Sequence, residues 1–144
     1  MLMNVLRPGG TITVIEGDHG SAYFHPDSAP ARAAIQCQIE LQHIAGGNAL
    51  IGRQIYPLMV AAGLEAVQVS PRVVYVDSSR PDFVEGFTKN TFTAMIEGVC
   101  ESAVATGLIQ REAFDKGIRD LRRTTEADGV FCYSFFKGVG KKPS

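Results

Sequence analysis

The sequence predicts an α/β fold, because strand patterns alternate with amphipathic helical patterns along its 144 residues. Three observations carry this prediction: a β-branched run at 11–15, a valine-rich run at 67–77 and an aromatic run at 130–136. Hydrophobic residues make up 45% of the chain and charged residues 20%, so there is enough apolar material for a packed core. Length and composition together predict a single domain over 1–144.

Residues 5–10, Val-Leu-Arg-Pro-Gly-Gly, predict the end of a helix and a turn, since proline and glycine both interrupt helices. The residues before this turn are too few for a stable helix of their own. We expect that an upstream helix has been cut off, and a frayed N-terminus is the alternative. The strand at 11–15 follows, and its apolar side chains on both faces predict burial in a parallel sheet.

Two helices are predicted next. The first covers 29–44, with Pro30 in its first turn, where a proline is tolerated. The second covers about 53–62, and Pro57 favours a late start because proline disrupts a helix beyond its first turn. Gly63 is suited to the C-terminal cap of this second helix.

The rest of the chain predicts two strands and two further helices. The strand at 67–77 contains Pro71, which places it at a sheet edge or a bulge. Helices are predicted over about 82–106 and 111–127 from the spacing of their apolar residues. The last strand covers 130–136 and is expected to end at the glycine at position 138.

Three segments in this order resemble the second half of the class I S-adenosylmethionine-dependent methyltransferases. They are the Pro8-Gly9-Gly10 turn into a strand, the Ala62-Gly63-Leu64 helix end before the next strand, and the terminal strand at 130–137. The resemblance implies the C-terminal half of a Rossmann-like methyltransferase sheet, with strands 5, 6 and 7 and flanking helices. In the family the last two of these strands are antiparallel neighbours. The implied activity is methylation of a small-molecule acceptor with S-adenosylmethionine as cofactor.

The chain departs from the family pattern in two ways. It lacks the family's Gly-rich loop after the first strand and the acidic residue that binds the ribose, so no cofactor-binding residue is assigned and the isolated chain is expected to be inactive. Residues 78–128 form a two-helix insertion between the last two strands. An insertion of this kind predicts a cap over the substrate or an oligomer surface.

The end of the first strand carries the candidate catalytic residues. Asp18 and His19 are candidate bases for methyl transfer to oxygen or nitrogen, and Glu16 beside them is a candidate substrate contact. A polar turn in which Asp18 bonds to nearby backbone N–H groups is the alternative. A metal site formed by His19 and His25 is a second alternative, although neither helical His spacing nor a Cys-x-x-Cys pair supports a metal.

Three more residues are candidate substrate contacts. Tyr23 and Phe24 could form an apolar wall over the reacting centre, and ordinary packing explains them equally well. Arg53 could clamp a substrate carboxylate with two hydrogen bonds. Pairing of Arg53 with Glu16 or another structural acid is the alternative.

The composition also bears on partners and location. The net charge is −1 and basic residues form no long run, which argues against a nucleic-acid partner. No apolar run approaches the roughly 18 residues that cross a bilayer, so no membrane partner is expected. Three widely spaced cysteines predict reduced thiols and a cytoplasmic protein.

Two rival functions remain open. One is a non-catalytic α/β binding or dimerisation module derived from the same fold, and the other is an unrelated α/β hydrolase using Asp18 and His19. The strand at 12–15 would leave an unpaired sheet edge, which predicts a homodimer or association with a chain that supplies the N-terminal half of the fold.

Overall fold

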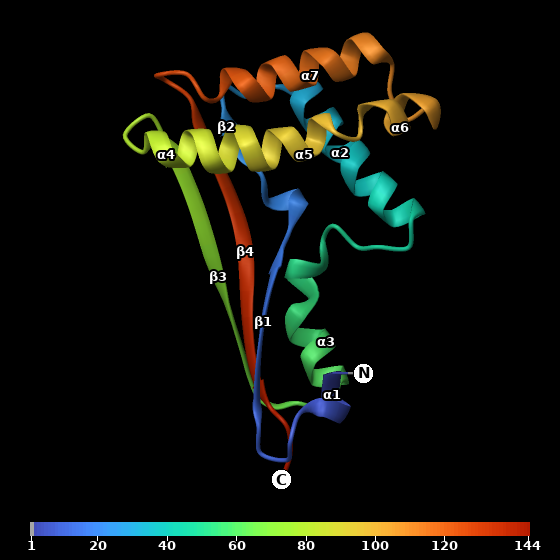
Figure 1. Cartoon of the computed structure of the whole chain (residues 1–144), viewed down its shortest axis with the longest axis vertical. Coiled ribbons are helices and arrows are strands. Elements are labelled where there is room, and N and C mark those ends of the chain that lie inside the picture. The colour runs from blue at the N-terminus through green and yellow to red at the C-terminus, as the bar shows by residue number, and fades with distance from the viewer. Residues whose placement is uncertain (1) are drawn as a thin grey trace. The chain divides into compact units, whose positions relative to one another are not determined.

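The computed structural model describes residues 2–144, which form two compact units (Figure 1). The first unit contains the residues up to Asp18, Leu50–Val73 and Ser134–Ser144, and the second contains His19–Ala49 and Val74–Tyr133. The described part of the chain is mixed α/β, as predicted, with helices and a four-stranded sheet. The strands are β1 (Thr11–Gly17), β2 (Tyr23–His25), β3 (Glu65–Asp77) and β4 (Val130–Lys141).

Strand β4 is the common neighbour in this sheet. In the first unit it pairs antiparallel with β1, from Thr11 opposite Lys141 to Gly17 opposite Phe135. In the second unit it pairs antiparallel with β2, which the sequence analysis missed because three residues are too short for a periodic signal. Strand β3 also pairs with β4, so β4 lies between β1 and β3.

One face of the sheet in the first unit is covered by a helix. Helix α3 (Ile55–Ala61) runs beside β1 in Figure 1, and Ile55, Met59 and Leu64 form a buried cluster with residues of β1, β3 and β4. Helix α3 begins two residues before Pro57, which confirms the late start that this proline predicts. The short helix α1 (Leu2–Val5) and the 3-10 turn η2 (Ile51–Gln54) complete the unit.

The prediction that the last strand ends at Gly138 is wrong, because β4 continues to Lys141. A Cβ at Gly138 would lie 2.5 Å from both Ile55 and Met59, and a Cβ at Gly140 would lie 2.9 Å from Met59. These glycines therefore do not break the strand. Glycine in a strand interior often marks a close approach, and here it lets α3 pack tightly on β4.

The predicted burial of β1 on both faces is also wrong. Ile12 and Val14 point to the α3 side and are partly buried, whereas Ile15 on the other face is 56% exposed. The antiparallel pairing with β4 explains this difference, since antiparallel sheets often have one covered and one solvated face.

The second unit is built on two helices, α2 (Ala29–Ile44) and α7 (Arg111–Arg123). Helix α2 has the predicted bounds, and Ser28 caps it by accepting a hydrogen bond from the Ala31 backbone N–H at 3.1 Å. Gly117 of α7 lets the two helices touch, because a Cβ there would lie 2.5 Å from the Pro30 carbonyl oxygen. The α2 side of this contact carries a small residue as well, since the Cβ of Ala34 would lie 3.0 Å from the same added atom.

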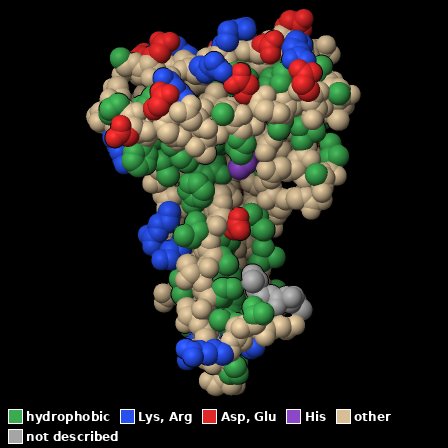
Figure 2. All heavy atoms as spheres, in the orientation of Figure 1, with side chains coloured by type: hydrophobic (Ala, Val, Ile, Leu, Met, Phe, Trp, Pro, Cys, Tyr) green, Lys and Arg blue, Asp and Glu red, His purple; other side chains and the backbone are tan. Residues whose placement is uncertain are grey.

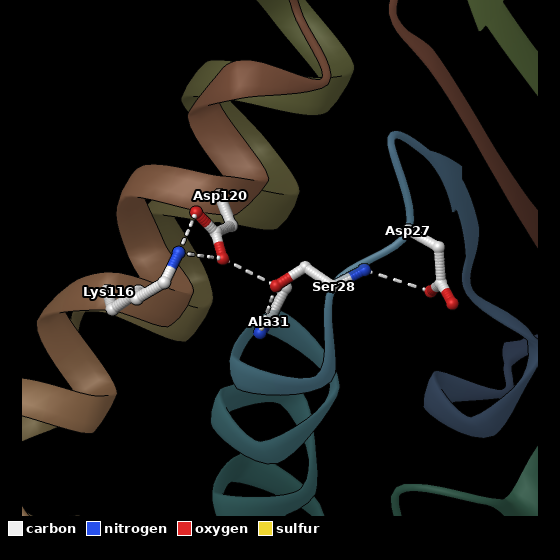
Figure 3. A network of polar contacts seen from close by, with 5 residues as sticks. All are labelled: Asp27, Ser28, Ala31, Lys116 and Asp120. Carbon is white, nitrogen blue, oxygen red and sulfur yellow. Dashed lines mark hydrogen bonds and ion pairs between the residues drawn. The ribbon is translucent and has the colours of Figure 1, made fainter.

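A polar network fixes the same contact (Figure 3). The Ser28 hydroxyl donates to Asp120 on α7 at 2.5 Å, and Lys116 Nζ lies 2.9 Å from the same carboxylate. Asp27 accepts from the Ser28 backbone N–H at 2.9 Å. Burial would raise the pKa of the Asp120 carboxyl, but the Ser28 hydroxyl and Lys116 bring it below its usual range.

The predicted helix over 82–106 is interrupted in the structure. It comprises α4 (Pro81–Phe83), the π-helix η3 (Val84–Thr93), α5 (Ala94–Glu97) and α6 (Cys100–Ala105). A break at residues 98–99 separates α5 from α6. The predicted helix over 111–127 ends earlier, at Arg123, because the following residues form a turn in which the Thr124 hydroxyl donates to the Leu121 carbonyl at 2.7 Å.

The surface of the second unit is charged and mixed in sign. On the face shown in Figure 2, acidic and basic side chains lie side by side over its helices. Two ion pairs on the surface of the second unit join Arg122 to Glu97 at 2.6 Å and Arg123 to Asp128 at 2.7 Å. The Arg123 guanidinium lowers the pKa of Asp128 to about 2. Charges of alternating sign indicate a solvated surface.

Candidate functional site

Asp18, a candidate base, forms a two-bond ion pair with Arg53 in the first unit. Arg53 Nε lies 2.6 Å from Asp18 Oδ2, and Nη2 lies 2.8 Å from Oδ1. The Asp18 side chain is 2% exposed and the Arg53 side chain 52% exposed. Burial of a carboxylate is costly without such a cation, so the pair favours a positioning role for Asp18.

Close packing of the backbone explains how these two residues meet. Asp18 follows β1, and Arg53 lies in η2 next to Gly52. A Cβ at Gly52 would lie 2.9 Å from the Gly17 carbonyl oxygen and 2.8 Å from the Phe136 ring. Only glycine allows η2 to approach β1 this closely, and this approach places the guanidinium beside the carboxylate. Arg53 therefore pairs with Asp18 rather than with Glu16.

His19, the other candidate base, lies in the second unit and contacts Tyr133 of β4. Its Nδ1 atom is 2.7 Å from the Tyr133 hydroxyl, which is within hydrogen-bond distance. In the tautomer in which Nδ1 donates to this hydroxyl, Nε2 carries the lone pair that can accept a proton. The contact fixes the orientation of the imidazole ring, and the Nε2 atom is itself buried.

An aromatic cluster holds this pair in place. The Phe92 ring packs edge-on against His19 with centroids 6.2 Å apart, and it contacts Tyr133 at 5.4 Å. Phe131 lies 4.7 Å from Phe92, and both phenylalanines are buried. Phe92 belongs to η3, so the inserted segment contributes directly to the positioning of His19.

His19 lines a small hollow of about 140 Å³ in the second unit. One wall is the first part of α2, and the other is the 3-10 turn η1 (His19–Ser21). The α2 wall consists of residues three or four positions apart, which share one helix face: Arg32, Ile35, Gln36 and Ile39. The hollow thus combines apolar walls with three polar side chains, as small-molecule sites commonly do.

The remaining predicted contacts lie elsewhere. Glu16 is exposed and lines an apolar groove of about 210 Å³ between α3 and β1. Tyr23 is 70% exposed on β2. Phe24 stacks on Phe131 at 6.4 Å and is therefore a packing residue of the aromatic cluster. None of these three lines the hollow beside His19.

Sequence reasoning missed most of the residues around His19. Tyr133 belongs to the aromatic run that predicts the last strand, and no local signal links it to a histidine 114 positions away. The α2 residues could have been found, because Arg32, Ile35 and Ile39 recur at helical spacing on a helix whose bounds were predicted correctly.

Metal sites, membrane spans and the comparisons with known proteins give no further indication of function. Among residues 2–144, no three His, Cys, Asp or Glu side chains are placed to hold a metal ion, so no third ligand of these types joins His19 and His25 there. The helices within that range are too short or too polar to span a bilayer. No protein-family model matches the chain, and no curated protein shows a significant match.

Proposed function

We propose that this chain forms the substrate side of a class I S-adenosylmethionine-dependent methyltransferase that acts on a small molecule. The strand arrangement supports this proposal best: β1 follows the Pro8-Gly9-Gly10 turn, and β4 lies between β1 and β3. The resemblance implies the same relation, with strand 5 after Pro-Gly-Gly and strand 7 beside strand 6. On this proposal β1, β3 and β4 are strands 5, 6 and 7 of a Rossmann-like sheet.

The described glycines do not offer a site for S-adenosylmethionine. Gly46 and Gly47 follow helix α2 rather than a strand, and Gly138 and Gly140 are covered by α3. A cofactor loop needs glycines between a strand and a helix N-terminus, where backbone can approach the ligand. We therefore assign no residue of 2–144 to the cofactor.

The chain's own residues are assigned to the acceptor. His19, held by Tyr133, is the base that takes a proton from the acceptor's hydroxyl or amine. Asp18 is paired with Arg53 and positions the end of β1. Direct action of Asp18 as the base is the alternative. The helices between β3 and β4 support the acceptor pocket through Phe92.

Alanine substitutions in the complete gene product test this assignment. If His19 is the base, His19→Ala lowers the rate of methyl transfer from labelled S-adenosylmethionine by roughly a hundredfold or more and leaves cofactor affinity unchanged. Asp18→Ala measured in parallel separates a base from a positioning residue. An unchanged turnover, or equal loss of cofactor affinity, would favour the polar-turn alternative.

The DNA sequence upstream of Met1 provides a second test. A strand followed by a Gly-rich loop, encoded in frame or in a neighbouring chain, is expected if the proposal is correct. Without such a loop and without methyl transfer by the gene product, the enzyme assignment fails.

A non-catalytic dimerisation module is the second candidate, favoured by the edge of β1. Within residues 2–144, β1 pairs only with β4, and Ile15 is exposed on its uncovered face. An unpaired β-branched strand is a template for pairing with another chain. The three cysteines are free, which suits the reducing cytoplasm in which we place either candidate.

A further inference from the structure

The groove between α3 and β1 in the first unit has two walls that are regular in sequence. Strand β1 forms one wall with alternate residues, which point to the same side of a strand: Ile12, Val14 and Glu16. Helix α3 and its C-terminal cap form the other wall with residues that share one helix face: Ile55, Leu58, Met59 and Ala62. Apart from Glu16, the residues of 2–144 that line the groove are apolar. Its volume of about 210 Å³ is below the roughly 300 Å³ at which drug-sized sites begin, so it suits a small ligand.

Packing of α3 on β4 fixes the floor of the groove. Ile55 and Met59 are buried, and both would lie 2.5 Å from a Cβ at Gly138. Leu58 on the same helix is 49% exposed and forms the rim. The groove therefore combines a closely packed apolar floor with a rim that solvent reaches.

The charge on this side of the sheet is negative. Lys137 lies opposite Ile15 in the β1–β4 ladder, so its side chain is on the face away from α3, and Lys141 lies on that face as well. Glu16 instead lines the groove, and its exposed carboxylate forms no ion pair with any of residues 2–144. A cation in the groove would therefore meet an acid that has no competing partner and would not face the lysines of β4.

The position of Glu16 also limits the shape of a ligand. Glu16 follows Ile12 and Val14 at the same spacing of two residues, so the carboxylate lies at the end of an apolar row. Three residues at this spacing span about 14 Å of strand. A slender ligand with a hydrocarbon chain and a charge at one end matches this arrangement.

We infer that this groove binds a small apolar amine, with its hydrocarbon chain along Ile12 and Val14 and its ammonium group at Glu16. Burial of the hydrocarbon chain supplies most of the affinity, since an exposed ion pair contributes little. Glu16 thus selects the sign of the head group. The inference goes beyond the proposed function and does not depend on it, because neither His19 nor methyl transfer enters it.

Titration of the full chain with hexylamine tests the inference, with chemical shifts of backbone amides as the measurement. Hexanol and hexanoate are the matched ligands, because they have the same chain length and differ in head-group charge. We expect saturable binding of hexylamine with shifts in β1 and α3. Hexylamine is expected to bind about two- to fivefold more tightly than hexanol, the value of an exposed ion pair, and hexanoate is expected to bind most weakly. The preference for the amine is expected to shrink at high salt.

Glu16→Gln tests the selection of charge. It is expected to abolish the preference for hexylamine over hexanol and to leave the affinity for hexanol unchanged. Glu65→Gln is the matched control, because it removes an exposed carboxylate of β3 that does not line the groove. We expect Glu65→Gln to retain the preference.

Leu58→Gln tests the apolar wall. It is expected to weaken binding of all three ligands by about threefold or more, because it removes apolar surface that the hydrocarbon chain covers. Val60→Gln is the matched control, since Val60 on the same helix is 48% exposed and lies outside the groove. Thermal melts confirm that each variant is folded.

The inference is overturned if the folded chain shows no saturable binding, if hexanoate binds as tightly as hexylamine, or if Glu16→Gln and Glu65→Gln show the same preference. An affinity that falls as the chain concentration rises would assign the groove to a second copy of this chain and would also overturn the inference. Failure of the proposed function is seen separately, in the methyl transfer assay of the complete gene product.

Discussion

At the scale of single residues, Gly117 sets the distance between α2 and α7. Gly117→Ala would place a methyl group 2.5 Å from the Pro30 carbonyl oxygen and 3.0 Å from the Ala34 Cβ, so the helices must separate. We expect this substitution to lower the free energy of unfolding by about 1–3 kcal/mol, the usual cost of overpacking. Chemical denaturation of the two proteins measures the difference.

Gly86→Ala is the matched control for this prediction. Gly86 lies in the helical segment η3, and a Cβ there would meet no atom within 4 Å. We expect an unchanged or higher stability, by up to about 1 kcal/mol, because alanine restricts the unfolded chain without a clash. A gain in stability at both positions would show that helical propensity, and not the contact with Pro30, governs Gly117.

The pKa of Asp120 links the same contact to pH. The pKa is lowered in the folded protein, so the unfolded chain takes up a proton first as the pH falls. The stabilisation is therefore present above the ordinary aspartate pKa of about 3.9 and is lost as the pH falls through the lower folded value. We expect Asp120→Asn to lower the melting temperature at pH 6.

The difference in melting temperature between Asp120→Asn and the unsubstituted protein is expected to shrink as the pH falls from 5 to 2.5. Glu112→Gln on the same helix is the control, since Glu112 is exposed and makes no ion pair among residues 2–144. A constant difference across this pH range would contradict a role for the Asp120 charge.

For the candidate site, the sequence predicts which element the residues follow but not which residues they contact. The strand at 11–15 predicted that Asp18 and His19 would follow a sheet strand, and they do. The partners could not be predicted in the same way. Arg53 reaches Asp18 because Gly52 allows a close approach, and Tyr133 reaches His19 across 114 positions. Both contacts depend on tertiary packing rather than on local spacing.

At the scale of elements, the π-helix η3 carries two buried hydroxyl groups that lack a partner within the described part of the chain. The Oγ1 atoms of Thr88 and Thr93 make no hydrogen bond to any of residues 2–144, and both side chains are buried. A buried polar group without a partner is destabilising, and removal of such a group can be neutral or stabilising. We therefore expect Thr88→Val and Thr93→Val to keep or raise the free energy of unfolding in denaturant titrations.

Thr124→Val is the control for the two threonine substitutions. Thr124 is buried to a similar degree, but its hydroxyl donates to the Leu121 carbonyl at 2.7 Å. We expect Thr124→Val to cost about 0.5–1.5 kcal/mol, the net value of one hydrogen bond. Equal losses of unfolding free energy at all three positions would mean that the hydroxyls of Thr88 and Thr93 have hydrogen-bond partners in solution.

The elements that were predicted well are those with local signals. Ser28 and Pro30 mark the start of α2, and the observed bounds of α2 equal the predicted ones. The π-helix was not predicted because it uses residues that also suit an α-helix. The extension of β4 past Gly138 was missed for a different reason, since only the packing of α3 explains why glycine is needed there.

At the scale of the whole molecule, the proposal predicts weak cofactor binding by these 144 residues alone. Within residues 2–144 no adjacent glycine pair follows a strand and leads into a helix N-terminus, so the dissociation constant for S-adenosylmethionine is expected to be about 1 mM or weaker. Isothermal titration calorimetry measures this constant directly. Micromolar affinity would show that another segment binds the cofactor.

The uncovered edge of β1 predicts self-association. Within residues 2–144 this strand pairs only with β4, and neither a proline nor a lysine protects it. Burial of an apolar side chain such as Ile15 contributes about 1.5–3 kcal/mol of free energy, which favours packing of this face of β1 against another chain. We therefore expect light scattering after size-exclusion chromatography to give twice the chain mass of 15.5 kDa at tens of micromolar.

Substitution at the edge separates strand pairing from other modes of association. Ile15→Lys places a charge on the uncovered face of β1 and is expected to yield monomers. Tyr56→Lys is the matched control, because Tyr56 on α3 has the same exposed fraction of 56% as Ile15 but does not lie on the strand. Dimers that persist in Ile15→Lys and dissociate in Tyr56→Lys would place the interface on α3. A monomeric unsubstituted protein with a cooperative melt would instead show that the edge of β1 needs no partner chain.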